Sequence, residues 1–141
     1  MDRVMKEIFQ SPCFDKAREL PYFQAMINEK IIPIEADINK DSLALKPEDR
    51  ELLTRELDVI INCAASVDFN EQMTDAINVN YNGCMRMLDL AHECKNLQIF
   101  THVSTAYVNC EKKGFIKEQI YDIDQDAEEL ISRVYKMSKK D

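Results

Sequence analysis

The sequence predicts an α/β fold with a doubly wound parallel sheet, and three observations favour this class. Leu57–Cys63 holds an apolar strand core around Asn62, which suggests burial on both faces, as is typical of parallel sheets. Apolar residues recur at helical spacing through Met73–Cys94, which predicts a long helix. Strand-like and helix-like segments alternate along the chain, and that order closes a parallel sheet through βαβ crossovers.

The first part of the chain is predicted to form short helical pieces followed by one strand. Ser11-Pro12 is a typical helix start, and Pro21 precedes a second short apolar face. Ile31–Ile34 is rich in β-branched residues, so we expect a strand that ends at Asp37. Pro33 has no backbone N–H group, which favours an edge position for that strand.

The later elements follow from their apolar spacing and their boundary residues. Proline at the first position and acidic residues behind it predict a helix over Pro47–Glu56. Gln98–Ser104 is predicted to be the third strand, and Gly114–Asp126 a polar loop. Apolar residues that share one face predict a last helix over Ala127–Tyr135.

The composition is that of a globular chain and excludes several functional classes. Of the 141 residues, 45% are hydrophobic and 31% are charged, which is enough apolar content for one core. We therefore expect a single domain over residues 1–141. The formal net charge of −8 argues against nucleic acid or an anionic membrane as the main partner. No apolar run is long enough to span a membrane, and the first ten residues lack the apolar core of a signal peptide.

The cysteines and histidines do not suggest a disulfide framework or a metal site. The five cysteines are odd in number and widely spaced, which fits a reducing compartment. His92 and His102 lie at no familiar zinc-ligand spacing, so no metal site is expected. Cys63 and Cys110 have no base beside them in the sequence, and we interpret them as small apolar or loop residues rather than nucleophiles.

Small and polar residues follow each of the three predicted strands. The first strand ends at Asp37, the second leads into Cys63-Ala64-Ala65-Ser66, and the third ends at Ser104-Thr105. In open α/β sheets, ligands bind at the carboxyl ends of the strands. Each feature alone also has a structural explanation, such as capping, tight packing or ordinary strand-end hydroxyl groups. Their joint occurrence on three strands favours a ligand site.

The residue types at these strand ends suit a dinucleotide and a carbonyl substrate. Small side chains allow a dinucleotide to approach the backbone closely. The Asp37 carboxylate can accept a hydrogen bond from an adenine amino group. A carbonyl that accepts a hydride develops negative charge on its oxygen, and a hydroxyl donor such as that of Thr105 can stabilise this charge while a general acid delivers the proton.

Longer stretches of the sequence carry a specific resemblance. Val59–Asn109 includes the pieces "NCAASVDFNE", "CKNLQIF" and "THVSTAYVN", and this stretch resembles the NAD(P)-binding domain of fatty acyl-CoA reductases, which are extended short-chain dehydrogenases/reductases. The pieces "IFQSPCFDKAR" and "IIPIEADINKDSLAL" upstream, and "IKEQIYDIDQDAEELI" downstream, resemble the same family. The resemblance implies a Rossmann-type domain that uses NADPH to reduce a long-chain fatty acyl-CoA to a fatty alcohol.

The resemblance also implies roles for individual residues. Thr105, with Ser104 beside it, matches the hydroxyl that polarises the substrate carbonyl. The residues that match cofactor-binding positions are Asp37 and Ile38 near adenine, and Cys63, Ala64 and Ala65 in the small-residue turn. Asn80, counted with the same site, matches the asparagine of the long helix that supports the catalytic water and lysine.

The chain also departs from the family pattern, which begins with a first strand and a glycine-rich phosphate turn. The only glycines here are Gly83 and Gly114, and neither lies in such a turn. We therefore expect an incomplete Rossmann-type domain that is inactive and poorly soluble on its own. The preference for NADPH over NADH rests on the resemblance and on no residue of this chain.

Tyr135 and Lys139 match the Y-x-x-S/T-K pattern of the superfamily. Residues four apart share a helix face, and a nearby lysine lowers the pKa of a tyrosine hydroxyl. In acyl-CoA reductases, however, this segment aligns better with the helix that precedes the catalytic tyrosine. The preferred interpretation is that Tyr135 packs on a helix face, and a catalytic role is the alternative.

Two other functions remain open at this stage. One is a different extended reductase or epimerase that acts on a steroid, sugar or polyketide carbonyl, which a catalytic Tyr135 would favour. The other is a non-catalytic truncated domain that packs against a partner. Membrane association at the peroxisome or the endoplasmic reticulum is implied by the resemblance only, through regions absent from this chain, and the oligomeric state is unknown.

Overall fold

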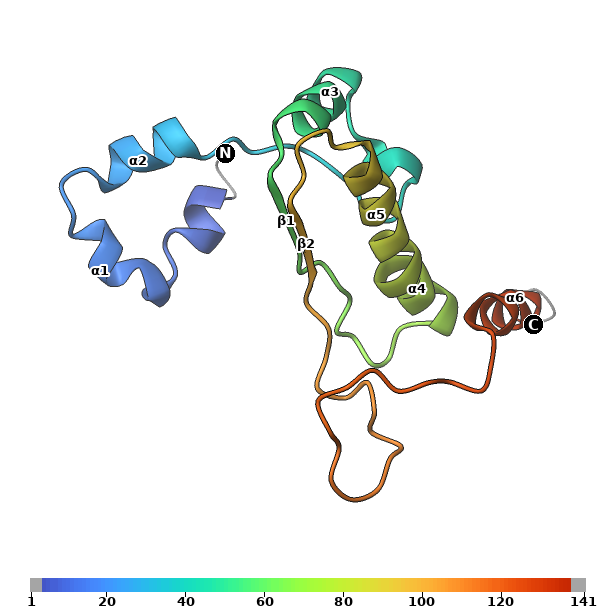
Figure 1. Cartoon of the computed structure of the whole chain (residues 1–141). Coiled ribbons are helices and arrows are strands. Elements are labelled where there is room, and N and C mark those ends of the chain that lie inside the picture. The colour runs from blue at the N-terminus through green and yellow to red at the C-terminus, as the bar shows by residue number, and fades with distance from the viewer. Residues whose placement is uncertain (1–3, 138–141) are drawn as a thin grey trace. The chain divides into compact units, whose positions relative to one another are not determined.

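The computed structural model describes residues 4–137, which divide into two compact units with the boundary between Glu35 and Ala36. Figure 1 shows the elements of both units. Within the described residues, no helix is both long and apolar enough to cross a bilayer.

The first unit consists of short helical segments around an aromatic cluster. Its elements are η1 (Val4–Ile8), η2 (Pro12–Phe14), α1 (Asp15–Arg18) and α2 (Phe23–Lys30). The rings of Phe9, Phe14 and Phe23 lie with their centroids 5.0–6.5 Å apart, a range in which aromatic pairs stabilise a fold. Ile27 on α2 is fully buried. The expectation of short helical pieces is thereby confirmed.

The second unit contains a two-stranded sheet and most of the predicted helices. Its elements are η3 (Asp41–Ala44), α3 (Pro47–Glu56), β1 (Val59–Asn62), α4 (Met73–Ile77), η4 (Asn78–Asn82), α5 (Gly83–Glu93), β2 (Ile99–His102) and α6 (Ala127–Met137). The helix predicted over Pro47–Glu56 is confirmed to the residue. The long helix is confirmed as the continuous run from α4 to α5, in which η4 is a π-helical turn, a feature frequent at functional sites.

The two strands pair in parallel, with Val59 opposite Ile99 and Asn62 opposite His102. Figure 1 shows α4 and α5 along one side of this pair. Ile60 and Asn62 face the helices and are buried, whereas Ile61 on the other face is 67% exposed. The predicted burial of β1 on both faces is therefore wrong, because the described helices of this unit cover one face only. The α/β class is confirmed, and a doubly wound arrangement is not formed by residues 4–137.

The strand predicted at Ile31–Ile34 is also wrong. These residues leave α2 in extended conformation, starting with Ile31 at φ −110° and ψ 116°, but they join neither strand of the sheet. A β-branched run becomes a strand only when a neighbour supplies ladder partners, and the described residues provide none. The segment still leads to Asp37, whose backbone N–H donates to the Leu43 carbonyl at 2.8 Å.

A left-handed turn fixes the segment that follows Asp37. Ser42, Leu43 and Ala44 all have positive φ, between 48° and 61°, which costs conformational energy for residues other than glycine. Leu43 is nevertheless only 3% exposed, and the surrounding η3–α5 packing offsets the cost. The turn thereby holds the Asp37 region against α5.

An ion pair and several hydrogen bonds connect helix α3 to the end of α5 and the loop behind it. The Arg50 guanidinium donates two hydrogen bonds to the Glu93 carboxylate, at 2.6 and 2.9 Å. The backbone N–H of Lys95 and the side chain of Asn96 donate to carbonyls at the end of α3, which satisfies groups that a helix leaves unpaired at its end. These contacts fix the loop that leads from α5 into β2.

Candidate functional site

A cleft of about 860 Å³ lies at the carboxyl ends of β1 and β2. This is the edge where ligands bind in open α/β sheets. The site residues predicted there all line it: Cys63, Ala64, Ala65, Asn80, Ser104 and Thr105. The structure therefore brings together six predicted residues from three separate stretches of the sequence.

Asn80 fixes the loop that follows β1. Its side-chain oxygen accepts a hydrogen bond from the Ser66 backbone N–H at 2.8 Å, and its amide nitrogen donates to the Ser66 carbonyl at 3.2 Å. Both ends of the amide are thus engaged by one residue of the loop. The π-helical turn η4, which carries Asn80, therefore holds Ala64-Ala65-Ser66 in place along the cleft.

Thr105 occupies the first turn after β2. Its hydroxyl oxygen accepts a hydrogen bond from the Tyr107 backbone N–H at 3.2 Å, and its carbonyl accepts one from Val108 at 3.4 Å. A hydroxyl group has one donor and two acceptor positions. The Thr105 hydroxyl hydrogen therefore remains available to a ligand oxygen in the cleft.

Asn62, at the end of β1, supports residues that line the cleft, a role that its sequence position alone did not indicate. It is 3% exposed, its side-chain nitrogen lies 3.3 Å from His102 Nδ1, and its oxygen accepts from the Ala64 backbone N–H at 3.4 Å. Cys84 Sγ lies 3.7 Å from the same ring nitrogen of His102, so His102 connects β1 to α5. His102 also lines the cleft. The available signal was a polar residue inside an otherwise apolar strand, since such groups are buried only with partners.

Asp37 and Ile38 do not line this cleft but form a neighbouring turn. Asp37 Oδ1 accepts a hydrogen bond from the Asn39 backbone N–H at 2.9 Å, and Oδ2 has no hydrogen bond within residues 4–137. Ile38 packs against Gly83, where an added Cβ would lie 2.6 Å from Ile38 Cγ1. At Gly83, helix α5 therefore approaches Ile38 more closely than a residue with a Cβ atom would allow.

Tyr135 lies on α6 and is not among the residues that line the cleft. Its hydroxyl accepts from the Asn82 side chain at 3.3 Å and donates to the Thr74 carbonyl at 3.4 Å. The Tyr81 hydroxyl donates a hydrogen bond to Glu128 Oε1 at 3.1 Å, and this bond raises the pKa of Tyr81. Both tyrosines therefore attach α6 to the α4–η4 segment. Lys139 lies outside the described residues, and a catalytic Tyr135/Lys139 pair stays a prediction.

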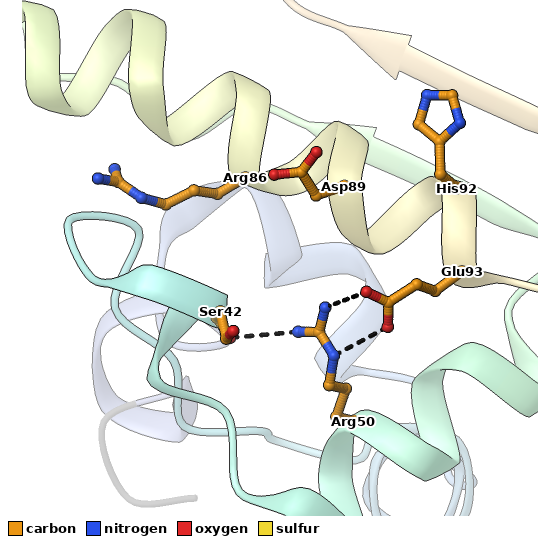
Figure 2. A pocket seen from close by; sticks show the side chains of 6 residues that line it. All are labelled: Ser42, Arg50, Arg86, Asp89, His92 and Glu93. Atoms are coloured by element: carbon orange, nitrogen blue, oxygen red, sulfur yellow. Dashed lines mark hydrogen bonds and ion pairs between the residues drawn. The ribbon is translucent and has the colours of Figure 1, made fainter.

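A second, charged pocket of about 420 Å³ lies between α3, η3 and α5. Figure 2 shows its lining, which includes Arg50, Arg86, Asp89 and Glu93. The hydrogen bonds from Arg50 lower the pKa of Glu93, and those to Glu93 raise the pKa of Arg50. The lining holds two arginines and two acidic residues, so it offers little net charge to a ligand. Its main role is to join three elements.

Comparison with known proteins places these observations in a family. A family model of NAD-binding domains, described as "Male sterility protein", matches residues 1–140. Among curated proteins, fatty acyl-CoA reductase 1 of Mus musculus is 41% identical over 128 residues, which are 90% of this chain and 24% of the mouse protein. An alcohol-forming fatty acyl-CoA reductase of Simmondsia chinensis is 36% identical over 122 residues, or 84% of this chain and 25% of that protein.

A chloroplastic relative extends the range of similar proteins. Fatty acyl-CoA reductase 2 of Arabidopsis thaliana is 32% identical over 126 residues, which cover 87% of this chain and 20% of the relative. The chain thus spans about a quarter of the length of the curated relatives that it matches.

Proposed function

Because this chain belongs to the NAD-binding family described as "Male sterility protein", we propose that it is part of the cofactor-binding domain of a fatty acyl-CoA reductase. The proposed reaction is the reduction of a long-chain acyl-CoA to a fatty alcohol through an aldehyde, which consumes two NADPH and two protons and releases coenzyme A as the free thiol. The observation that supports it most directly is the cleft at the carboxyl ends of β1 and β2, which gathers Ala64, Ala65, Asn80 and Thr105. The named reductases among its relatives support the substrate class.

The residues present fit one part of a dinucleotide site. The small side chains of Ala64 and Ala65 leave backbone accessible in the cleft, which suits a ligand that approaches the main chain closely. Asp37 keeps one carboxylate oxygen without a hydrogen bond among the described residues, which suits an adenine amino donor. Residues 4–137 contain no glycine-rich turn of the kind that binds a pyrophosphate, so that contact is not assigned to them.

In this proposal the chain binds the cofactor, orients the substrate and polarises the substrate carbonyl group. A nicotinamide cofactor supplies the hydride when bound. Thr105, with Ser104 beside it, donates its hydroxyl hydrogen to the carbonyl oxygen of the substrate as negative charge develops there. Asn80 keeps the Ser66 loop in place, so the wall that faces the ligand does not have to reorganise during the reaction.

The first test is turnover of a long-chain acyl-CoA by the full protein that contains this chain, with NADPH and NADH compared. We expect Thr105→Val to lower kcat about 100-fold, as removal of one oxyanion donor does, because valine keeps the shape and removes the hydroxyl. Cofactor binding should change little in this variant. Full turnover by Thr105→Val would contradict the role of Thr105, and no turnover of acyl-CoA by the wild-type protein would contradict the proposed function.

Binding at Asp37 is tested separately. Asp37→Ala should weaken cofactor binding roughly 3- to 10-fold, the effect of losing one hydrogen bond, whereas Asp37→Asn keeps an acceptor oxygen and should lose less. A fluorescence titration of the nicotinamide measures both. Equal dissociation constants for wild type and Asp37→Ala would remove adenine recognition from this residue.

A further inference from the structure

Two segments that the proposed function assigns to the cofactor both accept hydrogen bonds from the side chain of Arg86. The Asp37–Asn39 turn is proposed to receive adenine, and η4 carries Asn80, which fixes the loop of the cleft. We propose that Arg86 on α5 is a positioning residue for the cofactor, which holds these two segments in one arrangement. The inference rests on the proposed function, because it takes the adenine role of Asp37 from it.

Arg86 contacts both segments with one guanidinium group. One terminal nitrogen donates to the Ile38 carbonyl at 3.0 Å and to the Asn78 carbonyl at 3.3 Å, and the other donates to Asn78 Oδ1 at 3.1 Å. Its Nε also lies 3.8 Å from the carboxylate of Asp41, whose side chain is fully exposed. A planar guanidinium can serve several acceptors at fixed angles, which lysine cannot.

Two further contacts hold the Asp37–Asn39 turn next to the helical run that carries Arg86. Asn78, which accepts from Arg86, also donates its amide nitrogen to Asn39 Oδ1 at 3.1 Å. Gly83 lies one helical turn before Arg86 on the same face and brings α5 against Ile38. The Asp37–Asn39 turn is therefore held to the helix by a close backbone approach, by Arg86 and by Asn78.

Arg86 is also shielded from solvent. Its side chain is 18% exposed, so its hydrogen bonds are weakened less by water than those of a surface arginine. Figure 2 shows its guanidinium directed away from the Arg50–Glu93 pair on the other side of the pocket. The two arginines of the charged pocket thus have different main partners: Arg50 binds Glu93 and the Ser42 carbonyl, and Arg86 binds the turn that is proposed to receive adenine.

The polar partners of Arg86 are Ile38, Asn78 and Asp41, which are not among the residues that line the cleft, so its effect on cofactor affinity is expected to pass through the Asp37–Asn39 turn. The distinguishing consequence is non-additivity. Two residues that act through one network do not add in their effects, whereas a general loss of stability would add to any local effect. Once Asp37 has lost its carboxylate, the precise position of its turn should no longer influence cofactor affinity.

The experiment is a double-mutant cycle on cofactor binding by the full protein, read by titration of NADPH fluorescence. We expect Arg86→Met to weaken binding about tenfold, and Arg86→Lys about threefold, because lysine keeps the charge and loses the fork. The double variant Asp37→Ala/Arg86→Met should bind within about twofold of Asp37→Ala alone. Arg55→Met, which removes an arginine from an exposed pair with Glu56, is the charge-matched control and should bind like wild type.

A second readout does not depend on the cofactor. Without ligand, amide hydrogen exchange at Asn39 should be faster in Arg86→Lys than in wild type, because the N–H donated to Asp37 becomes exposed more often. If Arg86→Met does not fold, Arg86→Lys carries the same cycle with Asp37→Ala.

Each outcome supports or overturns the proposal. Wild-type affinity in Arg86→Met and Arg86→Lys, or effects that add to that of Asp37→Ala, would overturn the role of Arg86 and leave the proposed function intact. A wild-type protein that binds neither NADPH nor NADH would overturn the proposed function and, with it, this role.

Discussion

At the scale of single residues, Gly83 controls how closely α5 approaches the Asp37–Asn39 turn. An added Cβ would lie 2.6 Å from Ile38 Cγ1 and 2.9 Å from Cδ1, so Ile38 would have to move. Overpacking of this kind costs roughly 1–3 kcal/mol, against a gain of about 1 kcal/mol from the helix propensity of alanine. We therefore expect Gly83→Ala to lower the free energy of unfolding by roughly 1 kcal/mol, measured by urea denaturation.

The control for this prediction removes the neighbour that Gly83→Ala would strike. In an Ile38→Ala background the clash is absent, so Gly83→Ala should become neutral or stabilising, because only the helix-propensity gain remains. The same cost in both backgrounds would show that the close approach to Ile38 is not what glycine serves at this position.

Individual site residues were predictable to the extent that their chemistry is local. Thr105 and the Ala64-Ala65 turn could be inferred because they follow strands, and the cleft indeed gathers them. Arg86 could not, because its three acceptors on Ile38 and Asn78 come from a segment 48 residues earlier and from a position eight residues earlier in the helical run. The sequence alone offers only an arginine on a helix, which is most often a solvated surface residue.

At the scale of secondary-structure elements, the Arg50–Glu93 pair joins α3 to α5, and it should make stability depend on pH. Its hydrogen bonds lower the pKa of Glu93 below the usual range for glutamate. A carboxylate with a lowered folded-state pKa stabilises the fold above its unfolded-state pKa, and this contribution is lost as pH falls through the folded-state value. We expect wild type to exceed Glu93→Gln by at most about 1 kcal/mol at pH 7, since the Glu93 side chain is half exposed.

The measurement is the free energy of unfolding of both proteins between pH 7 and pH 3. The difference should shrink as Glu93 becomes protonated and should be smaller in high salt. Glu56→Gln is the matched control, because Glu56 pairs with Arg55 within one element and both side chains are more than half exposed. A difference that stays constant over the whole pH range would assign the effect of Glu93→Gln to packing rather than to charge.

The elements themselves were predictable where their signals were local. The helices α3, α5 and α6 have apolar periods and boundary residues that suffice on their own, and their positions agree with the predictions. The segment at Ile31–Ile34 has an equally clear β-branched run, yet it forms no ladder, because a strand depends on a neighbour that its own residues do not encode. The same dependence explains why burial of β1 on both faces was expected and only one face is covered.

At the scale of the whole molecule, the second unit presents one apolar side of its sheet to solvent. Val59, Ile61, Ile99 and Val103 are each between 48% and 67% exposed. Side chains alternate between the two sides of a strand, and α5 contacts the opposite side through β1. An exposed apolar sheet surface of this kind favours association with other molecules.

The 141-residue chain is accordingly expected to bind the apolar dye ANS and to self-associate as its concentration rises, observed by fluorescence and by sedimentation velocity. Ile61→Thr/Ile99→Thr should reduce both effects, because threonine keeps the β-branched shape that suits a strand and lowers the apolar area. Ile120→Thr is the matched control: Ile120 is 97% exposed but lies in the loop before α6, so this variant should behave like the parent chain. A parent chain that stays monomeric, melts cooperatively and binds no dye would contradict the prediction, and equal effects of both variants would show that association does not proceed through the sheet.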